Sequence, residues 1–146
     1  YNMRSQTFAK TLPMAMVKGA LKRLDMIRTM PELKDKLWQN TNSLQSGLRS
    51  AGFDLGTTQT CITPVFLKGD VPEAMALVHD LRENHGVFCS IVVYPVIPKG
   101  LIILRLIPTA THTQGDIDET IEAFTAIREL LENGTYKKIA TTMMQE

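Results

Sequence analysis

The run Leu101–Ile107 is the most apolar stretch expected to be a strand, and it constrains the fold more than any other segment. Aliphatic side chains dominate it, and the proline-bounded loop 95–100 precedes it. Aliphatic and β-branched residues favour extended structure, and a strand that is apolar on both faces is typical of the interior of a sheet. The run therefore predicts a central β-strand.

The patterns around this strand predict an α+β fold. After residue 50 we expect, in chain order, a strand at 61–67, a helix at 72–83, a strand at 87–94, the central strand, and a helix that Thr113 and Asp116 cap. A right-handed crossover makes the strands at 61–67 and 87–94 parallel, and the central strand then fits between them, antiparallel to both. The sequence predicts a two-layer α/β sandwich: a small, mainly antiparallel sheet in β-α-β-β-α order with helices on one face.

The two ends of the chain are expected to differ from this core. A long helical pair, opened at Pro13 and divided at Pro31, covers residues 13–50 and would extend the helical layer or lead to a missing neighbour. The apolar residues of its first helix recur at helical spacing: Val17, Ala20, Leu21, Leu24 and Ile27. Asn133-Gly134 ends the last helix, and residues 135–146 are expected to form a loose tail.

Composition and charge exclude several classes of protein. The chain has 146 residues, of which 44% are hydrophobic and 21% charged, as in one globular domain. Sixteen basic and fifteen acidic residues give a net charge of +1, so no nucleic-acid or membrane partner is expected. Cys61 and Cys89 are too few for a disulfide framework and indicate a cytoplasmic protein. Because the sequence begins at Tyr1 and not at Met, we expect a domain of a longer polypeptide.

The common catalytic motifs are absent from the sequence. It contains no CxxC, HExxH, P-loop, GxGxxG or GxSxG pattern. The potential metal ligands are unconnected in spacing: His79, His85, His112, Cys61 and Cys89. We therefore predict no metal site and no catalytic residue within this chain.

Arg105 is the residue that points most directly to function, because it is the only charge in the central strand. An unpaired guanidinium in apolar surroundings is costly, so Arg105 needs an anion. One interpretation is an ion pair with a carboxylate of the last helix, such as Asp118 or Glu122. The other is a ligand carboxylate, which the planar guanidinium binds bidentately. The residues alone leave both open.

Lys10 allows two interpretations as well. It stands between small and hydroxyl residues, a setting in which a lysine can form a Schiff base with pyridoxal phosphate. It can equally be an exposed lysine in an extended lead-in to the first helix.

Several segments resemble the C-terminal domain of the α-oxoamine synthases, which are pyridoxal-phosphate enzymes of aminotransferase fold type I. The segments are Tyr94-Pro95-Val96-Ile97-Pro98-Lys99-Gly100, Leu104-Arg105, Thr109-Ala110-Thr111-His112-Thr113, Asp116-Ile117, Ala123-Phe124, Glu32–Trp38 and Ala51-Gly52-Phe53. The resemblance covers about residues 4–131. Within the family, the segment 94–100 is most similar to 2-amino-3-ketobutyrate CoA ligase, and 8-amino-7-oxononanoate synthase is the next candidate.

The resemblance implies that residues 1–134 are the C-terminal small domain of such an enzyme and that 135–146 is a tail. The full-length enzyme would be a cytoplasmic homodimer that condenses an amino acid with an acyl-CoA. Arg105 would hold the amino-acid carboxylate, and the loop 95–100 would border the substrate channel. The cofactor lysine would lie upstream, so we expect no covalently bound pyridoxal phosphate on this chain and no activity of the chain alone.

The resemblance also places Lys10 in a segment downstream of the cofactor lysine. In relatives this segment can contact the cofactor phosphate across the dimer interface. Ala9 replaces the usual serine of that segment, so Lys10 and Thr11 are the expected contacts. The alternatives are a serine palmitoyltransferase-type member, an aminotransferase of the same fold, against which the motif 110–113 argues, and a stand-alone α+β binding module without catalysis.

Overall fold

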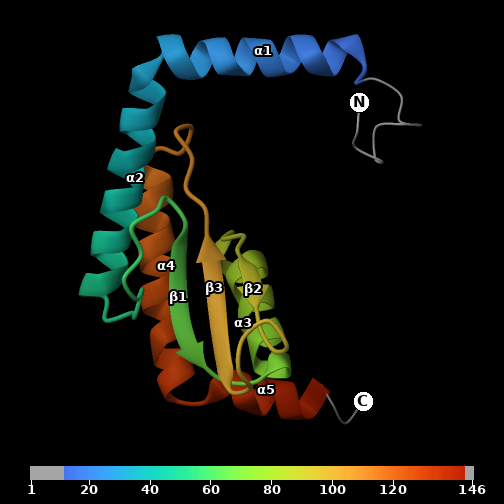
Figure 1. The fold of residues 1–146 in the computed structure, drawn as a ribbon. Helices are drawn as coiled ribbons and strands as arrows, with labels where there is room; N and C mark the ends of the chain where they lie inside the picture. The colour runs from blue at the N-terminus through green and yellow to red at the C-terminus, as the bar shows by residue number, and fades with distance from the viewer. Residues whose placement is uncertain (1–11, 144–146) are drawn as a thin grey trace. The chain divides into compact units, whose positions relative to one another are not determined.

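A computed structural model of the chain describes residues 12–143 (Figure 1). These residues divide into two compact units, with the boundary between Asp35 and Lys36. The elements are α1 (Met14–Thr29), α2 (Pro31–Ser50), β1 (Thr63–Lys68), α3 (Val71–His85), β2 (Ser90–Val92), β3 (Leu101–Leu106), α4 (Gln114–Glu132) and α5 (Thr135–Met143). No helix in this part of the chain is long and apolar enough to cross a membrane.

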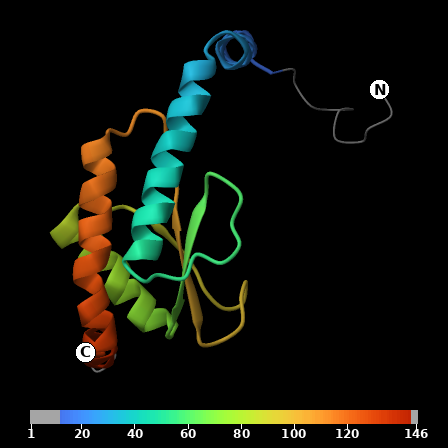
Figure 2. The same cartoon turned by 90° about the vertical axis from the view of Figure 1, so that its left-hand side faces the viewer.

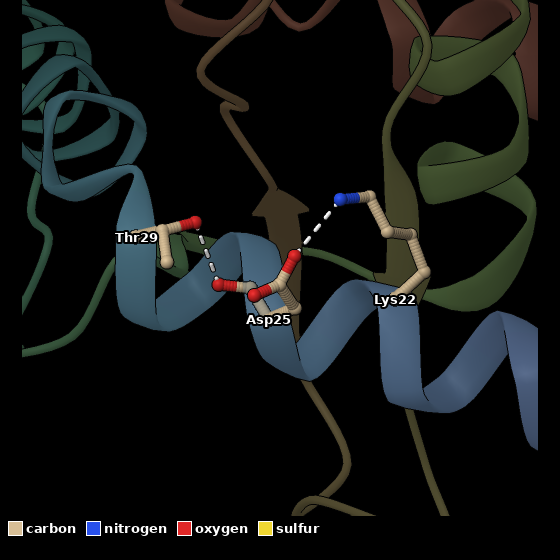
Figure 3. Close-up of polar contacts among 3 residues, drawn as sticks. All are labelled: Lys22, Asp25 and Thr29. Atoms are coloured by element: carbon tan, nitrogen blue, oxygen red, sulfur yellow. Dashed lines mark hydrogen bonds and ion pairs between the residues drawn. The ribbon is translucent and has the colours of Figure 1, made fainter.

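Helix α1, in the N-terminal unit, buries none of its side chains. The stripe predicted from its apolar spacing is open: Leu21 is 61% exposed and Ile27 is 75% exposed. Its polar contacts are local, since Lys22 Nζ pairs with Asp25 Oδ2 at 2.8 Å and Thr29 Oγ1 donates to the Asp25 carbonyl at 2.9 Å (Figure 3). Such a pair one turn apart adds only a few tenths of a kcal/mol to a helix, about 0.2–0.5.

The second unit is built on a three-stranded sheet with the order β1-β3-β2, in which β3 is antiparallel to both neighbours (Figure 1). This is the predicted topology, with the apolar run at 101–107 in the centre. Pro64 lies on β1, at an edge, where its missing N–H costs no hydrogen bond to a second neighbour. Strand β2 is shorter than predicted because the chain leaves the sheet after Val92 and enters the loop that contains Pro95 and Pro98.

One face of the sheet is covered by helices, as predicted. Alternate residues of β3 point toward them and are buried: Ile102, Leu104 and Leu106. They share one core with Leu77 of α3 and Phe124 of α4. Figure 2 shows α2 and α4 on the same side of the strands. Among the described residues of this second unit, no helix covers the opposite face of the sheet.

The start of α4 is fixed by the predicted capping box. The Asp116 N–H donates to Thr113 Oγ1 at 3.2 Å, and the Thr113 N–H donates to Asp116 Oδ2 at 2.7 Å. The Thr113 hydroxyl also donates to Asp116 Oδ2, at 2.9 Å. The bonds from the N–H and the hydroxyl of Thr113 hold the pKa of the Asp116 carboxyl below its usual value. Asn40 of α2 secures the turn before α4, because its Nδ2 donates to the carbonyls of Thr109 and His112 at 2.9 and 2.8 Å.

The prediction of a loose tail after residue 134 is wrong for residues 135–143, which form α5. Tyr136 and Ala140 lie four residues apart on one helical face, and both are buried. The Tyr136 hydroxyl donates to Asp80 Oδ2 of α3 at 2.5 Å. Helix α5 therefore packs onto the domain, because the Tyr136 ring is buried and its hydroxyl has a hydrogen-bond partner in Asp80. Residues 144–146 lie outside the described residues.

We expect Tyr136→Phe to lower the free energy of unfolding by about 1–2 kcal/mol at pH 7, since it deletes a hydrogen bond to a half-exposed carboxylate. Burial opposes ionisation of Asp80, but hydrogen bonds from Tyr136 and Asn84 and the nearby His85 and His79 outweigh it and lower its pKa. The contribution of Asp80 is thus present above the unfolded pKa of about 3.8 and is lost as pH falls through the lower folded value. Urea unfolding of both proteins between pH 7 and pH 3 should show the difference shrinking; a constant difference would contradict this explanation.

Candidate functional site

The open face of the sheet carries Arg105. Its side chain is exposed and lies on the face of β3 that the helices do not cover, because it alternates with the buried Leu104 and Leu106. Leu101, Ile103 and Ile107 share that face, as predicted, and none of them is buried. The structure therefore presents one guanidinium at the centre of a largely apolar, uncovered strand.

The strand register sets the two immediate neighbours of Arg105. Pro64 of β1 stands opposite it on one side, and Ser90 of β2 stands opposite it on the other. Arg105 Nε donates a hydrogen bond to Ser90 Oγ at 3.1 Å. Sequence reasoning did not single out Ser90, although pairing the predicted strands 87–94 and 101–107 in antiparallel register could have found it.

The predicted alternative of an ion pair between Arg105 and α4 is wrong. Helix α4 lies against the other face of the sheet, out of reach of an outward-pointing side chain, and Asp118 Oδ1 instead accepts from Gln114 Nε2 at 2.8 Å. Within residues 12–143, the three recorded ion pairs join Lys22 to Asp25, Arg82 to Glu83 and Arg128 to Glu132. The charge of Arg105 is thus met by solvent and by one serine hydroxyl, not by a carboxylate of this part of the chain.

A cavity of about 270 Å³ lies at the loop that follows β2. Tyr94, Lys99 and Gly100 line it together with Gly69–Pro72, Val93 and Leu101. Lys99 Nζ sits 5.1 Å from the centre of the Tyr94 ring, within the range of a cation–π contact. Leu101 also shares the open face with Arg105. The two residues are four positions apart on β3, which is about 13 Å along the strand.

A second cavity, of about 320 Å³, lies where β3 ends and α4 begins. Its ionisable lining residues are His85, His112, Asp116 and Glu119. His112 Nδ1 accepts from the Thr109 N–H at 3.1 Å, so the imidazole braces the turn before α4. The two histidines have no common spacing in the sequence, because His85 ends α3 and His112 lies in the turn before α4, which the fold brings together.

The two cysteines are among the remaining candidate residues, and they differ in burial. Cys89 is buried, and burial raises the pKa of its thiol to about 11, so it stays protonated at neutral pH. Cys61 is a half-buried free thiol. Among the described residues, no three His, Cys, Asp or Glu side chains are placed to hold a metal ion. Lys10 and Thr11, the predicted phosphate contacts, lie outside the described residues, as does Ala9.

The model of the family "Aminotransferase class I and II" matches residues 2–124. The chain belongs to this family. It is 64% identical over all 146 residues to a cysteate-C-fatty acyltransferase of Capnocytophaga ochracea, and 34% identical over 128 residues, 88% of the chain, to 2-amino-3-ketobutyrate coenzyme A ligase of Escherichia coli. It spans 35% and 32% of the lengths of these two relatives, about a third.

A solved structure of SPT with PLP has the same fold. It superposes with a TM-score of 0.80 at 29% identity, covering 90% of this chain and 33% of that one. The predicted resemblance to the α-oxoamine synthases is thus confirmed at the level of the family and the fold. The ligase favoured by the segment Tyr94–Gly100 is, however, less similar to this chain than the cysteate-C-fatty acyltransferase is.

Proposed function

We propose that this chain is the C-terminal small domain of a pyridoxal-phosphate-dependent acyltransferase that condenses an amino acid with an acyl-CoA. The observation that carries the proposal is Arg105, an exposed guanidinium on an uncovered, apolar sheet face with no carboxylate partner among the described residues. The family match and the relatives of known name support the same reaction class. The full-length enzyme would be a cytoplasmic homodimer, and α5 would belong to its small domain.

The role of Arg105 in this reaction is to hold the carboxylate of the amino acid. Its two terminal nitrogens make no hydrogen bond to the described residues. A planar fork of N–H donors matches two carboxylate oxygens better than an ammonium group can. Pyridoxal phosphate, when bound, supplies an electron sink for a carbanion on the amino acid. Lys10 and Thr11 are proposed to contact its phosphate from the neighbouring subunit, and the residue that binds it covalently would lie outside this chain.

For the amino acid and the acyl group, we propose cysteate and a long-chain acyl-CoA. The support is the 64% identity with a protein named as a cysteate-C-fatty acyltransferase, which extends over the entire chain. The loop 95–100 is proposed to border the acyl channel. The cavity at this loop has an apolar lining of Val71, Pro72, Val93 and Leu101, and Leu101 lies on the strand that carries Arg105. The likeness to the structure of SPT (serine palmitoyltransferase) favours serine as the second candidate amino acid.

A substrate screen of the full-length enzyme tests this function. Cysteate, serine, alanine and glycine are each paired with palmitoyl-CoA and with acetyl-CoA, and release of free CoA is followed with a thiol reagent. We expect the highest kcat/KM for cysteate with palmitoyl-CoA. A preference for glycine with acetyl-CoA would overturn the substrate assignment. Transfer of the amino group to a keto acid without CoA release would overturn the reaction class.

A further inference from the structure

Ser90 is the one side chain that holds the guanidinium of Arg105 by a hydrogen bond in the described structure. The contact joins directly opposed residues of β2 and β3, and the donor is Nε, not a terminal nitrogen. On the other side of β3, the opposed residue is Pro64, whose ring offers neither a donor nor an acceptor. The orientation of the guanidinium is therefore set from one side, by one hydroxyl.

The choice of Nε matters for how an anion can bind. A guanidinium has five N–H donors, and a carboxylate can take two of them either end-on, across the two terminal nitrogens, or side-on, across Nε and one terminal nitrogen. When Ser90 Oγ occupies the Nε–H, the side-on edge is no longer complete. The end-on edge, with both terminal nitrogens, is left for the ligand.

We propose that Ser90 is a positioning residue for substrate binding: it fixes the plane of the Arg105 guanidinium so that the amino-acid carboxylate binds end-on to its two terminal nitrogens. This inference rests on the proposed function of Arg105 as the carboxylate anchor. It adds that the affinity for the amino acid depends on a residue of β2, a strand that need not touch the substrate. Holding a long side chain in its binding geometry before the ligand arrives reduces the entropy lost on binding.

The test measures binding of the amino acid to the full-length, cofactor-loaded enzyme by calorimetry, without acyl-CoA. The same titration is repeated with the α-carboxamide of the amino acid, which keeps the side chain and lacks only the anionic carboxylate. We expect Ser90→Ala to raise the Kd of the amino acid about 3- to 10-fold, the effect of one ordinary hydrogen bond. The Kd of the carboxamide should change less than about 2-fold, because a neutral amide does not form a charge-assisted pair with Arg105.

Ser43→Ala is the control for Ser90→Ala, and Ser90→Thr and Ser90→Val form a second matched pair. Ser43→Ala removes a half-buried hydroxyl that accepts from Gln114 Nε2 at 3.0 Å on the helical side of the domain, and it should leave both Kd values unchanged. Ser90→Thr keeps the hydroxyl and Ser90→Val removes it at nearly equal volume, and both β-branched residues suit a strand. Thr should preserve the affinity that Val loses, so the proposal remains testable even where Ser90→Ala alters the fold.

The outcomes separate this inference from the function on which it rests. If Arg105→Ala weakens binding of the amino acid while Ser90→Ala and Ser90→Val do not, the positioning role is overturned and the anchor stands. If the Ser90 variants weaken the amino acid and its carboxamide equally, the effect is structural and the positioning role is again overturned. If the wild-type enzyme does not distinguish the two compounds and Arg105→Ala changes neither Kd, the anchor itself is wrong.

Discussion

Replacing Arg105 with alanine is expected to weaken binding of the amino acid to the full-length enzyme by about 100-fold, which corresponds to about 3 kcal/mol. The reason is the geometry of the open sheet face: Arg105 has no carboxylate partner within the described residues, so an arriving carboxylate would meet a charge that is not already neutralised. The absorbance of the bound cofactor should be unchanged without substrate, because Arg105 is assigned to the amino acid and not to the cofactor. Calorimetric titration and an absorption spectrum measure the two quantities separately.

Arg82→Ala is the matched control for this experiment. Arg82 is an exposed arginine of α3 that pairs with Glu83 at 2.7 Å, and solvent screens an exposed pair of this kind so that it contributes little. We expect it to leave the Kd unchanged. Arg105→Lys should recover only part of the lost affinity, because an ammonium group keeps the charge but not the planar fork. Equal Kd values for the wild type and Arg105→Ala would remove the anchor from the proposed function.

Local sequence patterns contained most of the architecture. The apolar run at 101–107 predicted the central strand, and the right-handed crossover rule then placed the strand at 61–67 and the strand at 87–94 on either side of it. The capping box at Thr113 was also predicted, because its two residues are three positions apart and make their bonds with each other. These features depend on contacts between near neighbours or on rules of handedness, and both can be read from one sequence.

Features that depend on long-range contacts could not be predicted in the same way. The sequence pattern placed an arginine on a face with three apolar residues, but it did not tell which of the two faces α4 covers. The partner of Arg105 therefore stayed open between Asp118, Glu122 and a ligand. Residues 135–143 read as a tail because they follow the helix stop at Asn133-Gly134. Their packing includes the bond from Tyr136 to Asp80, 56 positions away, which no local pattern reveals.

Truncation of Phe124 is expected to have the largest effect on stability, lowering the free energy of unfolding of the 146-residue chain by about 3–5 kcal/mol. The Phe124 side chain is fully buried, and its ring meets that of Phe53 edge to face with the centroids 5.4 Å apart. Alanine would therefore lose the transfer free energy of a large side chain, leave a cavity between α4 and the sheet, and remove an aromatic pair. Since a domain of this size is stable by only about 5–15 kcal/mol, the loss is a large fraction of the total.

Phe88→Ala is the matched control, because it makes the same chemical change at a side chain that is 80% exposed in the described structure. We expect its free energy of unfolding, measured by urea titration, to stay within about 0.5 kcal/mol of the wild type, as for most surface substitutions. The comparison separates burial from residue type: both variants lose one phenyl ring, and only one of them loses packing. If Phe88→Ala proved as destabilising as Phe124→Ala, the loss at Phe124 could not be assigned to the burial of its side chain.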